Sequence, residues 1–315
     1  MKRVLFLLDE GAAGVPDSLL SLLPPDSFAV LAADAPSAAR QRAVEEAEII
    51  FGEPTLPELA AARSLRWVQM FWAGADRYLH GGFPRGVRLT TASGAYGETI
   101  AEHMLAMLLA LCRRLPAYGR RCDWQDLGSE KRLSGGTALI FGAGDIGGSL
   151  ARRLRALGVR TIGVCRETQR PREGFDALTS LSGAEVCLPQ ADFVLCAMPA
   201  GAATDGYFDA RRIALMRDDC VFINAGRGSI IAQNRLTQAL LDGKFFGVGL
   251  DVTTPEPLPT DCPLWQMDRV VLTPHVAGVS FGHLPQTEEK IWAICRENLC
   301  RYLAGEPLRN EVQVS

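Results

Sequence analysis

The sequence predicts an α/β protein of two domains, each built on a largely parallel sheet. Short apolar runs alternate with longer amphipathic segments along the chain, which is the pattern of parallel strands joined by crossover helices. The length of 315 residues exceeds what one hydrophobic core usually serves. Two series of candidate strands are also separated by a very apolar helical segment at residues 98–115.

The first strand series predicts a small sheet of its own. Its candidate strands are Val4–Leu8, Ile49–Phe51, Trp67–Phe71 and Val87–Thr90. The first of these follows Met1-Lys2-Arg3 and could begin a signal peptide, but Asp9 and Glu10 end the apolar run too early. We therefore expect a buried strand at this position.

The second strand series follows the apolar helical segment. Residues 98–115 are apolar on nearly every side and precede Pro116, so we expect a buried helix at a domain or subunit junction. Six candidate strands then predict a doubly wound sheet: Ala138–Phe141, Arg160–Cys165, Asp192–Cys196, Cys220–Ile223, Phe246–Leu250 and Val270–Leu272. A last helix is expected from Glu288 to Leu303, and its pattern does not say which sheet it packs on.

Composition and charge favour a small-molecule partner. Lys and Arg number 33 against 36 Asp and Glu, with no long run of like charge, so we expect binding neither to nucleic acid nor to a membrane. No stretch reaches the roughly 18 apolar residues of a transmembrane helix. The nine Cys include no Cys-x-x-Cys pair, which indicates reduced thiols in a cytoplasmic protein. No Cys/His spacing suggests a metal site.

A glycine-rich turn follows the first strand of the second series. The strand runs directly into Gly142-Ala143-Gly144-Asp145-Ile146-Gly147, and a helical pattern continues to Leu157. The first Gly permits a tight turn, the second lets a pyrophosphate approach the backbone, and the third lets helix and strand pack closely. A lone glycine pattern is often no more than a turn. Strand, glycines, helix and next strand together predict a dinucleotide site at the helix N-terminus.

The end of the next strand bears on the choice between NAD and NADP. In NAD-selective sites an acidic residue there usually binds the ribose 2′-hydroxyl. Here the place holds Cys165-Arg166, with Arg170 and Arg172 nearby, so a 2′-phosphate would meet cations. We expect NADP in preference to NAD. The alternatives are a solvated loop whose arginines touch nothing and a ribose contact from Glu167.

Three strand ends of the second series carry residues suited to chemistry. They are Asn224-Ala225-Gly226-Arg227-Gly228, Asp251-Val252-Thr253-Thr254-Pro255-Glu256-Pro257 and Thr273-Pro274-His275-Val276-Ala277-Gly278. Open α/β sheets place their sites at the carboxyl ends of strands. An Arg between two glycines can present a planar fork to a carboxylate, and Glu256 is available to pair with His275. Taken singly, the Arg could be a surface residue and the His structural.

Together these motifs resemble the D-2-hydroxyacid dehydrogenase family, and in particular its glyoxylate/hydroxypyruvate reductases. The resemblance covers essentially the whole chain, with the glycine turn and the three strand-end motifs in the family's order. It implies hydride transfer between NAD(P)H and a small 2-keto acid to give the D-2-hydroxy acid. It also implies a Rossmann-type dinucleotide domain, a smaller flavodoxin-like substrate domain, a homodimer, and a cleft that closes between the domains.

The same resemblance implies roles for single residues. Arg227 would bind the substrate carboxylate and polarise the keto oxygen, His275 would be the general acid/base, and Glu256 would orient His275. Hydride arriving at the keto carbon makes an alkoxide, which needs a proton and a nearby cation, so these residue types suit the reaction. Further cofactor contacts would come from Gly142, Gly144, Asp145, Ile146, Gly147, Arg166, Pro199, Thr204, Ala225, Gly226, Asp251 and Gly278.

One segment of the first half also resembles a family loop. Trp72-Ala73-Gly74 corresponds to the loop whose backbone N–H groups hold the substrate carboxylate, and Trp72 would restrict the pocket to short substrates. An ordinary turn is the alternative. Trp124 only loosely resembles a residue that enters the partner's active site in some relatives, and we expect a core or surface Trp. We expect structural roles for His80, His103 and His283.

The expected organisation is a substrate domain at 1–95, a dinucleotide domain at 96–284 and a C-terminal helix at 285–315 that returns to the substrate domain. Two rival functions remain. One is an NAD(P)-sensing interaction protein of the same fold, although the chain lacks the extensions that recruitment usually uses. The other is a phosphite-type dehydrogenase, which keeps Arg, Glu and His. A formate enzyme would carry Gln where Glu256 stands.

Overall fold

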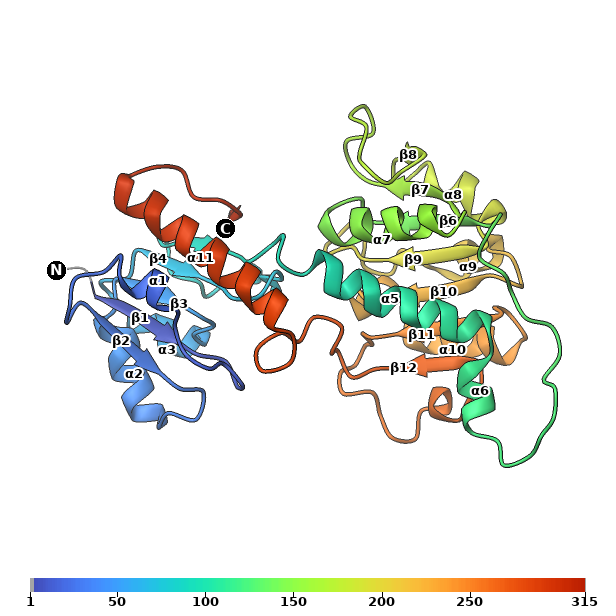
Figure 1. The fold of residues 1–315 in the computed structure, drawn as a ribbon, viewed down its shortest axis with the longest axis horizontal. Helices are drawn as coiled ribbons and strands as arrows, with labels where there is room; N and C mark the ends of the chain where they lie inside the picture. Colours follow the sequence, from blue (N-terminus) through green and yellow to red (C-terminus); the bar gives the residue numbers. More distant parts are fainter. Residues whose placement is uncertain (1–2, 315) are drawn as a thin grey trace. The chain divides into compact units, whose positions relative to one another are not determined.

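The computed structural model describes residues 3–314, which divide into two compact units (Figure 1). The smaller unit takes the chain up to Tyr96 and again from Val279, and the larger unit is Gly97–Gly278. The chain therefore returns to the smaller unit at Val279, which is earlier than the expected boundary at residue 285. The physical reason is that Phe281 packs edge-on against Phe71 and Trp292 of the smaller unit.

The smaller unit contains a parallel sheet with one antiparallel edge strand. Its strands lie in the order β13 (Glu311–Val312), β5 (Arg88–Thr90), β4 (Trp67–Gln69), β3 (Ile49–Phe51), β1 (Val4–Leu7) and β2 (Phe28–Leu31). The five parallel strands have the order 2-1-3-4-5, which is flavodoxin-like, as expected. The sequence reading missed β13, which has two residues, and β2, an edge strand with no fully buried side chain.

Five helices belong to the smaller unit: α1 (Asp17–Leu20), α2 (Ser37–Glu46), α3 (Leu56–Ala60), α4 (Asp76–Leu79) and α11 (Pro285–Ala304). The amphipathic pattern left open where α11 packs, and the structure places it on this sheet. The Tyr302 ring of α11 stacks on Trp67 with centroids 5.0 Å apart. The helix begins with Pro285 in its first turn and ends at Gly305, whose left-handed backbone closes it.

The larger unit contains a parallel sheet of seven strands. Their order is β12 (Val270–Leu272), β11 (Gly247–Leu250), β10 (Val221–Asn224), β9 (Phe193–Cys196), β6 (Thr137–Phe141), β7 (Arg160–Val164) and β8 (Ala177–Thr179). Counted from β6, this is the Rossmann order 3-2-1-4-5-6 with one further strand, so the expected fold is confirmed. The expected number of six strands is wrong, because β8 is three half-buried residues without an apolar run.

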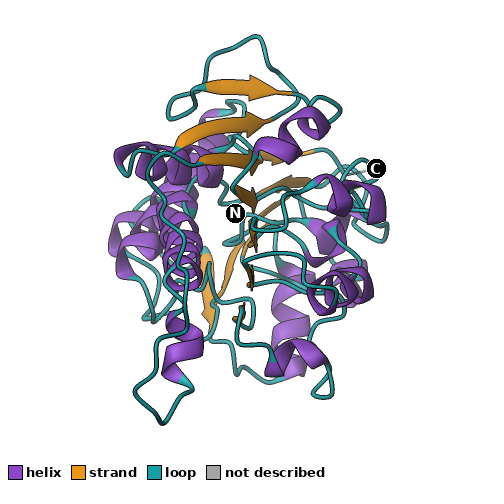
Figure 2. Ribbon diagram, turned by 90° about the vertical axis from the view of Figure 1, so that its right-hand side faces the viewer, coloured by secondary structure: helices purple, strands orange, loops and turns teal. Residues whose placement is uncertain are grey.

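Helices cover both faces of the larger sheet (Figure 2). α5 (Gly97–Cys112) and α7 (Asp145–Ala156) share one core with the sheet. The opposite core takes in α8 (Ala184–Cys187), α9 (Ala210–Leu215) and α10 (Gln233–Leu241). Short 3₁₀ turns lie at η1 (Leu188–Gln190), η2 (Gly228–Ile230) and η3 (Pro263–Gln266). This is the doubly wound arrangement that the alternating pattern predicts.

The helix expected at 98–115 is interrupted. α5 ends at Cys112, Arg114 takes a left-handed backbone with φ of 54°, and α6 (Leu115–Gly119) begins with Pro116 in its first turn. α5 is also not buried all round, because Leu109 is 39% exposed. Its exposed side combines the acidic Glu98 and Glu102 with the apolar Ala106 and Leu109.

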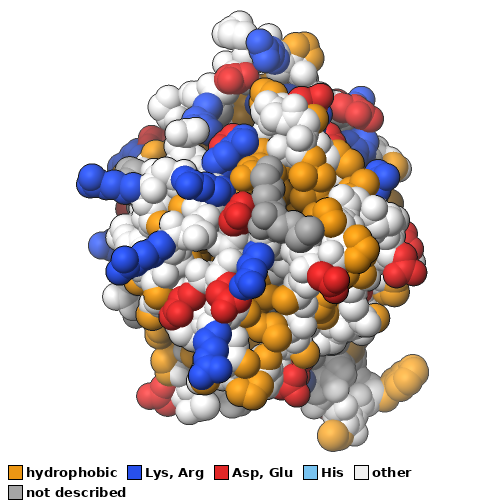
Figure 3. Space-filling view, turned by 90° about the vertical axis from the view of Figure 1, so that its left-hand side faces the viewer, with side chains coloured by type: hydrophobic (Ala, Val, Ile, Leu, Met, Phe, Trp, Pro, Cys, Tyr) orange, Lys and Arg blue, Asp and Glu red, His pale blue; other side chains and the backbone are white. Residues whose placement is uncertain are grey.

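The surface mixes the two signs of charge. On the face drawn in Figure 3, Lys and Arg side chains are interspersed with Asp and Glu, and small hydrophobic patches lie between them. All nine cysteines are free thiols. Among the described residues, no helix has the length and apolar character needed to span a bilayer.

Candidate active site

Arg227, Glu256 and His275 lie at one edge of the larger sheet. The strands β10, β11 and β12 are neighbours, and their last residues are paired in register. The segments that leave these strands line a pocket of about 220 Å³. Its walls are Arg227, Gly228, Ser229, Val252, Thr253, Thr254, Pro255, Glu256 and His275. The structure thus brings together the three residues that the strand-end motifs singled out.

His275 and Glu256 form a pair within the pocket. The Glu256 Oε2 lies 2.9 Å from the His275 Nδ1, and its Oε1 accepts a hydrogen bond of 2.9 Å from the Thr253 N–H. Both carboxylate oxygens are therefore held. An ionised Glu requires the proton on Nδ1, which leaves Nε2 of the half-exposed ring for a ligand.

The backbone of His275 has the left-handed φ of 56°, which non-glycine residues rarely adopt. Its N–H donates to the carbonyl oxygens of Asp251 at 2.8 Å and Thr273 at 3.0 Å. The buried Asp251 carboxylate also accepts from the Thr273 hydroxyl at 2.7 Å and from the N–H groups of Val276 at 2.9 Å and Ala277 at 3.2 Å. Asp251 therefore holds the turn that carries His275, a role that sequence reasoning missed.

His103 of α5 joins this support. Its Nε2 lies 3.0 Å from the Thr273 Oγ1 and 3.7 Å from the Asp251 Oδ1. Because the Thr273 hydroxyl gives its hydrogen to Asp251, it accepts one from His103, which places a proton on Nε2. The distance of 170 positions along the chain gave the sequence no signal for this contact.

The Arg227 turn is fixed by the buried Asn224. The Asn224 side chain donates to the Arg227 carbonyl at 2.9 Å and accepts from the Gly226 N–H at 3.1 Å. A Cβ on Gly226 would lie 2.6 Å from the Met198 carbonyl oxygen, and one on Gly228 would overlap the Thr253 carbonyl. The two glycines are therefore required by close packing. Gly226 packs against the segment after β9, and Gly228 packs against the segment that holds Glu256.

The glycine turn after β6 fits a bound pyrophosphate. Gly142 has φ of 101°, and a Cβ there would lie 2.7 Å from the Ala197 carbonyl oxygen. A Cβ on Gly147 would overlap the Gly142 carbonyl, whereas Gly144 is exposed with open space beside it. No side chain of residues 3–314 caps the N-terminus of α7, so its first N–H groups are available to an anion.

The other predicted cofactor positions surround the same edge. β6 and β9 are the neighbours between which the strand order reverses, the place where such sheets bind ligands. After β9, the Thr204 hydroxyl donates to the Pro199 carbonyl at 2.9 Å, and the Gly206 N–H donates to the Ser229 carbonyl at 2.7 Å. This loop therefore packs beside the Arg227 turn. Asp145 and Ile146 lie in the first turn of α7, and Gly278 ends the larger unit.

The arginines after β7 differ in their settings. Arg166 is exposed, and Arg170 is 86% exposed beside the Glu167 carboxylate at 4.0 Å. The Arg172 Nη1 donates to the Ala143 carbonyl at 2.9 Å, within the glycine turn. Its Nε is buried without a hydrogen-bond partner among residues 3–314. Arg172 is therefore the cation that reaches the glycine turn.

In the smaller unit, the segment Trp72–Gly74 follows β4. The Trp72 N–H donates to the Glu53 Oε1 at 3.1 Å, and its indole Nε1 donates to the Asp9 Oδ2 at 2.9 Å. The Trp72 N–H is therefore already paired within the smaller unit. The N–H groups of Ala73 and Gly74 donate no hydrogen bond within the described part of the chain. Trp124 is 105% exposed, so its core alternative is excluded.

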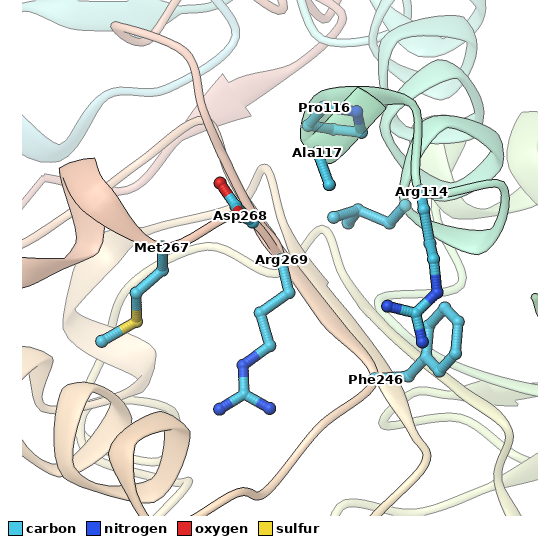
Figure 4. A pocket seen from close by; sticks show the side chains of 8 residues that line it. Arg114, Pro116, Ala117, Phe246, Met267, Asp268 and Arg269 are labelled. Carbon is cyan, nitrogen blue, oxygen red and sulfur yellow. The ribbon is translucent and has the colours of Figure 1, made fainter. Parts of the chain in front are cut away.

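A second pocket, of about 280 Å³, lies at the opposite edge of the larger sheet (Figure 4). Phe246 and Arg269, which line it, directly precede β11 and β12. The Arg114 guanidinium lies 4.9 Å from the centre of the Phe246 ring. None of the residues that the sequence singled out for chemistry lines this pocket.

The chain is similar to proteins of one enzyme family. The family model described as D-isomer specific 2-hydroxyacid dehydrogenase, NAD binding domain, matches residues 105–277. The glyoxylate reductase/hydroxypyruvate reductase of Homo sapiens is 32% identical over 73% of this chain and 71% of its own length. A solved family protein from Aeromonas salmonicida is 32% identical, with a TM-score of 0.86 over 99% of both chains. A solved NADPH-dependent glyoxylate/hydroxypyruvate reductase from Sinorhizobium meliloti is 26% identical, with a TM-score of 0.82 over 99% of this chain and 98% of that one.

Proposed function

Because this chain belongs to the D-isomer specific 2-hydroxyacid dehydrogenase family and is an NAD(P)-dependent oxidoreductase, we propose that it reduces a short 2-keto acid such as glyoxylate or hydroxypyruvate. The observation that carries the proposal is the pocket in which Arg227 lies with the paired His275 and Glu256. Relatives from Homo sapiens and Salmonella that bear the glyoxylate/hydroxypyruvate reductase name support the choice of substrate.

The residues that would hold the dinucleotide are the glycine turn and the first turn of α7 at the phosphates. Ala225 and Gly226 would lie against the nicotinamide, with further contacts from Pro199, Thr204 and Gly278. The open space at Gly144 and the uncapped N-terminus of α7 support this placement. When bound, the reduced nicotinamide supplies a hydride to the keto carbon.

The side chains then act on the keto oxygen as its negative charge develops. The Arg227 guanidinium binds the substrate carboxylate and polarises the keto oxygen, because a planar cation can serve two oxygens at once. The His275 Nε2 gives its proton to that oxygen, which completes the hydroxy acid. Glu256 holds the ring through Nδ1, and Asp251 holds the backbone of the same residue.

We propose that the N–H groups of Ala73 and Gly74 in the smaller unit bind a substrate carboxylate. Two adjacent N–H groups without partners, in a segment of small residues, are suited to an anion. Trp72 would limit the length of the substrate. A Trp72→Ala variant is expected to accept longer keto acids such as phenylpyruvate, and an unchanged substrate range would contradict this role.

We propose NADP as the preferred cofactor. Arg166 and Arg172 take the place where an acidic residue would bind an NAD ribose, and Arg172 reaches the glycine turn. We also propose a homodimer, because Leu109 and Leu115 are exposed on α5 and α6 of the larger unit. A cytoplasmic location is proposed because the nine cysteines are free thiols. Light scattering of the purified protein tests the dimer, and a monomer at micromolar concentration would contradict it.

The loss of absorbance of NADPH and NADH, measured in parallel, tests the function. The substrates are glyoxylate, hydroxypyruvate, pyruvate and phenylpyruvate. We expect oxidation of NADPH with one of the two shortest acids. Binding of reduced cofactor without turnover on any of them would contradict the proposal and favour an NAD(P)-sensing protein, and phosphite-dependent reduction of NADP would favour the phosphite enzyme.

A further inference from the structure

We propose that Glu53 is a positioning residue for substrate binding, which holds the Phe71–Gly74 segment so that Ala73 and Gly74 can receive an anion. This inference rests on the proposed function, because it takes that segment as part of the site for the substrate carboxylate. It concerns a residue outside the Arg227, Glu256 and His275 set.

Glu53 is held in place at its carboxyl group and at its backbone. Its Oε1 accepts hydrogen bonds from the N–H groups of Phe71 at 2.8 Å and Trp72 at 3.1 Å. Its own carbonyl accepts from the Arg40 guanidinium at 3.1 Å, and the carbonyl of the next residue, Pro54, accepts from the Tyr78 hydroxyl at 2.6 Å. The side chain therefore joins a fixed turn after β3 to the start of the substrate segment after β4.

The position lies at the ligand-binding edge of the smaller sheet. Strand order reverses between β1 and β3, and sheets of this topology bind ligands outside the carboxyl ends at that point. Asp9 follows β1, Glu53 follows β3 and Trp72 follows β4. Asp9 holds the Trp72 indole while Glu53 holds its backbone, so these two carboxyls fix the residue that precedes Ala73 and Gly74.

The second oxygen of Glu53 has no partner. Oε2 is buried and makes no hydrogen bond within residues 3–314, and the whole residue is 8% exposed. Buried polar atoms in proteins are nearly always paired, so an unpaired carboxyl oxygen in a folded protein calls for an explanation. Burying an uncharged carboxylic acid at this position costs far less free energy than burying a carboxylate.

The charged surroundings agree with an uncharged Glu53. The titratable groups that face it from the neighbouring elements are Asp9, Arg40, Arg77, Tyr78, Tyr96 and Cys295. Burial, and after it the charge of Asp9, raise the pKa of Glu53 to about 8, although the two N–H donors and Arg77 act to lower it. Below that pH the carboxyl is neutral and does not repel an anion bound at the next two N–H groups. Above it, a carboxylate would repel the substrate.

The test compares the KM for the preferred keto acid in wild type, Glu53→Gln and Glu53→Ala between pH 6 and 10 at saturating NADPH. Gln accepts the same two N–H groups but stays neutral. We expect the KM of wild type to rise about tenfold relative to that of Glu53→Gln from pH 7 to 10. A nearby like charge typically shifts an ionisation equilibrium by about one pKa unit, and the same repulsion would weaken the binding of an anion about tenfold. The ratio cancels every pH effect that the two proteins share.

The Ala variant loses the acceptor and is expected to raise KM about tenfold or more at every pH, while kcat falls less and NADPH affinity is unchanged. Glu45→Gln, at an exposed carboxylate of α2 that accepts a hydrogen bond from Gln41, is the control for general damage and should keep the wild-type pH profile of KM. A KM ratio between wild type and Glu53→Gln that stays constant with pH would overturn the inference. No reduction of any keto acid by wild type would instead overturn the proposed function.

Discussion

The support of His275 by Asp251 gives the most demanding prediction. Replacing Asp251 by Ala removes the acceptor from the Thr273 hydroxyl and from the N–H groups of Val276 and Ala277. The Ala277 N–H is buried, whereas Val276 is 41% exposed, so water can replace the lost partner only at Val276. Each buried donor left unpaired costs roughly 1 to 3 kcal/mol. We therefore expect Asp251→Ala to lower the free energy of unfolding by roughly 3 to 5 kcal/mol.

The same change should also release the left-handed backbone of His275. Misplacement of a catalytic group by about 1 Å costs on the order of 10²-fold in rate, so kcat is expected to fall by about that factor. Asp251→Asn keeps one acceptor oxygen and should lose less on both measures.

Urea unfolding and steady-state NADPH oxidation measure the two effects, with Asp219→Ala as the control. Asp219 is a half-exposed carboxylate of the same unit that pairs with Lys131 and Arg217, and its loss should cost no more than about 1 kcal/mol. NADPH binding by fluorescence separates a lost cofactor contact from a displaced His275. An Asp251→Ala protein with a stability loss below about 1 kcal/mol and a kcat close to that of wild type would refute the reasoning.

Three further predictions concern other parts of the structure. Gly228→Ala should lower the free energy of unfolding by about 2 kcal/mol or more and reduce kcat, because its Cβ would overlap the Thr253 carbonyl. Gly119→Ala, with open space around it, should do neither, and equal urea midpoints for the two variants would contradict this. Arg172→Ala should reduce the kcat/KM ratio of NADPH to NADH about tenfold through the lost cation, and an unchanged ratio would remove Arg172 from cofactor selection. Because the pKa of Glu53 is raised from 4.5 to about 8 in the folded protein, the folded state keeps a proton that the unfolded chain releases, so stability falls as pH rises from about 4.5 to about 8. Glu53→Gln should remove this loss of stability, which corresponds to at most roughly 5 kcal/mol. Unfolding curves of wild type and Glu53→Gln that shift in parallel between pH 5 and 8 would contradict the prediction.

The sequence predicted the elements whose local pattern is strong. The glycine turn between β6 and α7 has a fixed steric cause at each glycine, and the motifs around Arg227, Glu256 and His275 directly follow apolar strands. Parallel pairing in register then places their ends at one edge without further information. The fold class and the neighbourhood of these three residues were therefore within reach of the sequence.

Elements with weak local signals were missed for identifiable reasons. β8 has three half-buried residues without an apolar run, and β13 has two residues and is defined by its pairing with β5, which is distant in the sequence. The break between α5 and α6 depends on one left-handed residue, Arg114, which the apolar pattern of 98–115 conceals.

The contacts that support the site also join distant parts of the chain. The link of His103 to Thr273 spans 170 positions and that of Glu53 to Phe71 spans 18. An acidic residue after a strand can equally be a solvated turn. Only the buried setting of Glu53 distinguishes it, and burial at this position follows from tertiary packing rather than from local composition.

The central claim is that His275 protonates the keto oxygen of a short keto acid. The most direct measurement is kcat for NADPH oxidation with the preferred keto acid in wild type and His275→Ala, together with the Kd for NADPH. The account predicts a kcat lower by about 10² to 10⁴-fold, since general acid assistance is of that order, with a Kd that changes little. Turnover by His275→Ala close to that of wild type would contradict it.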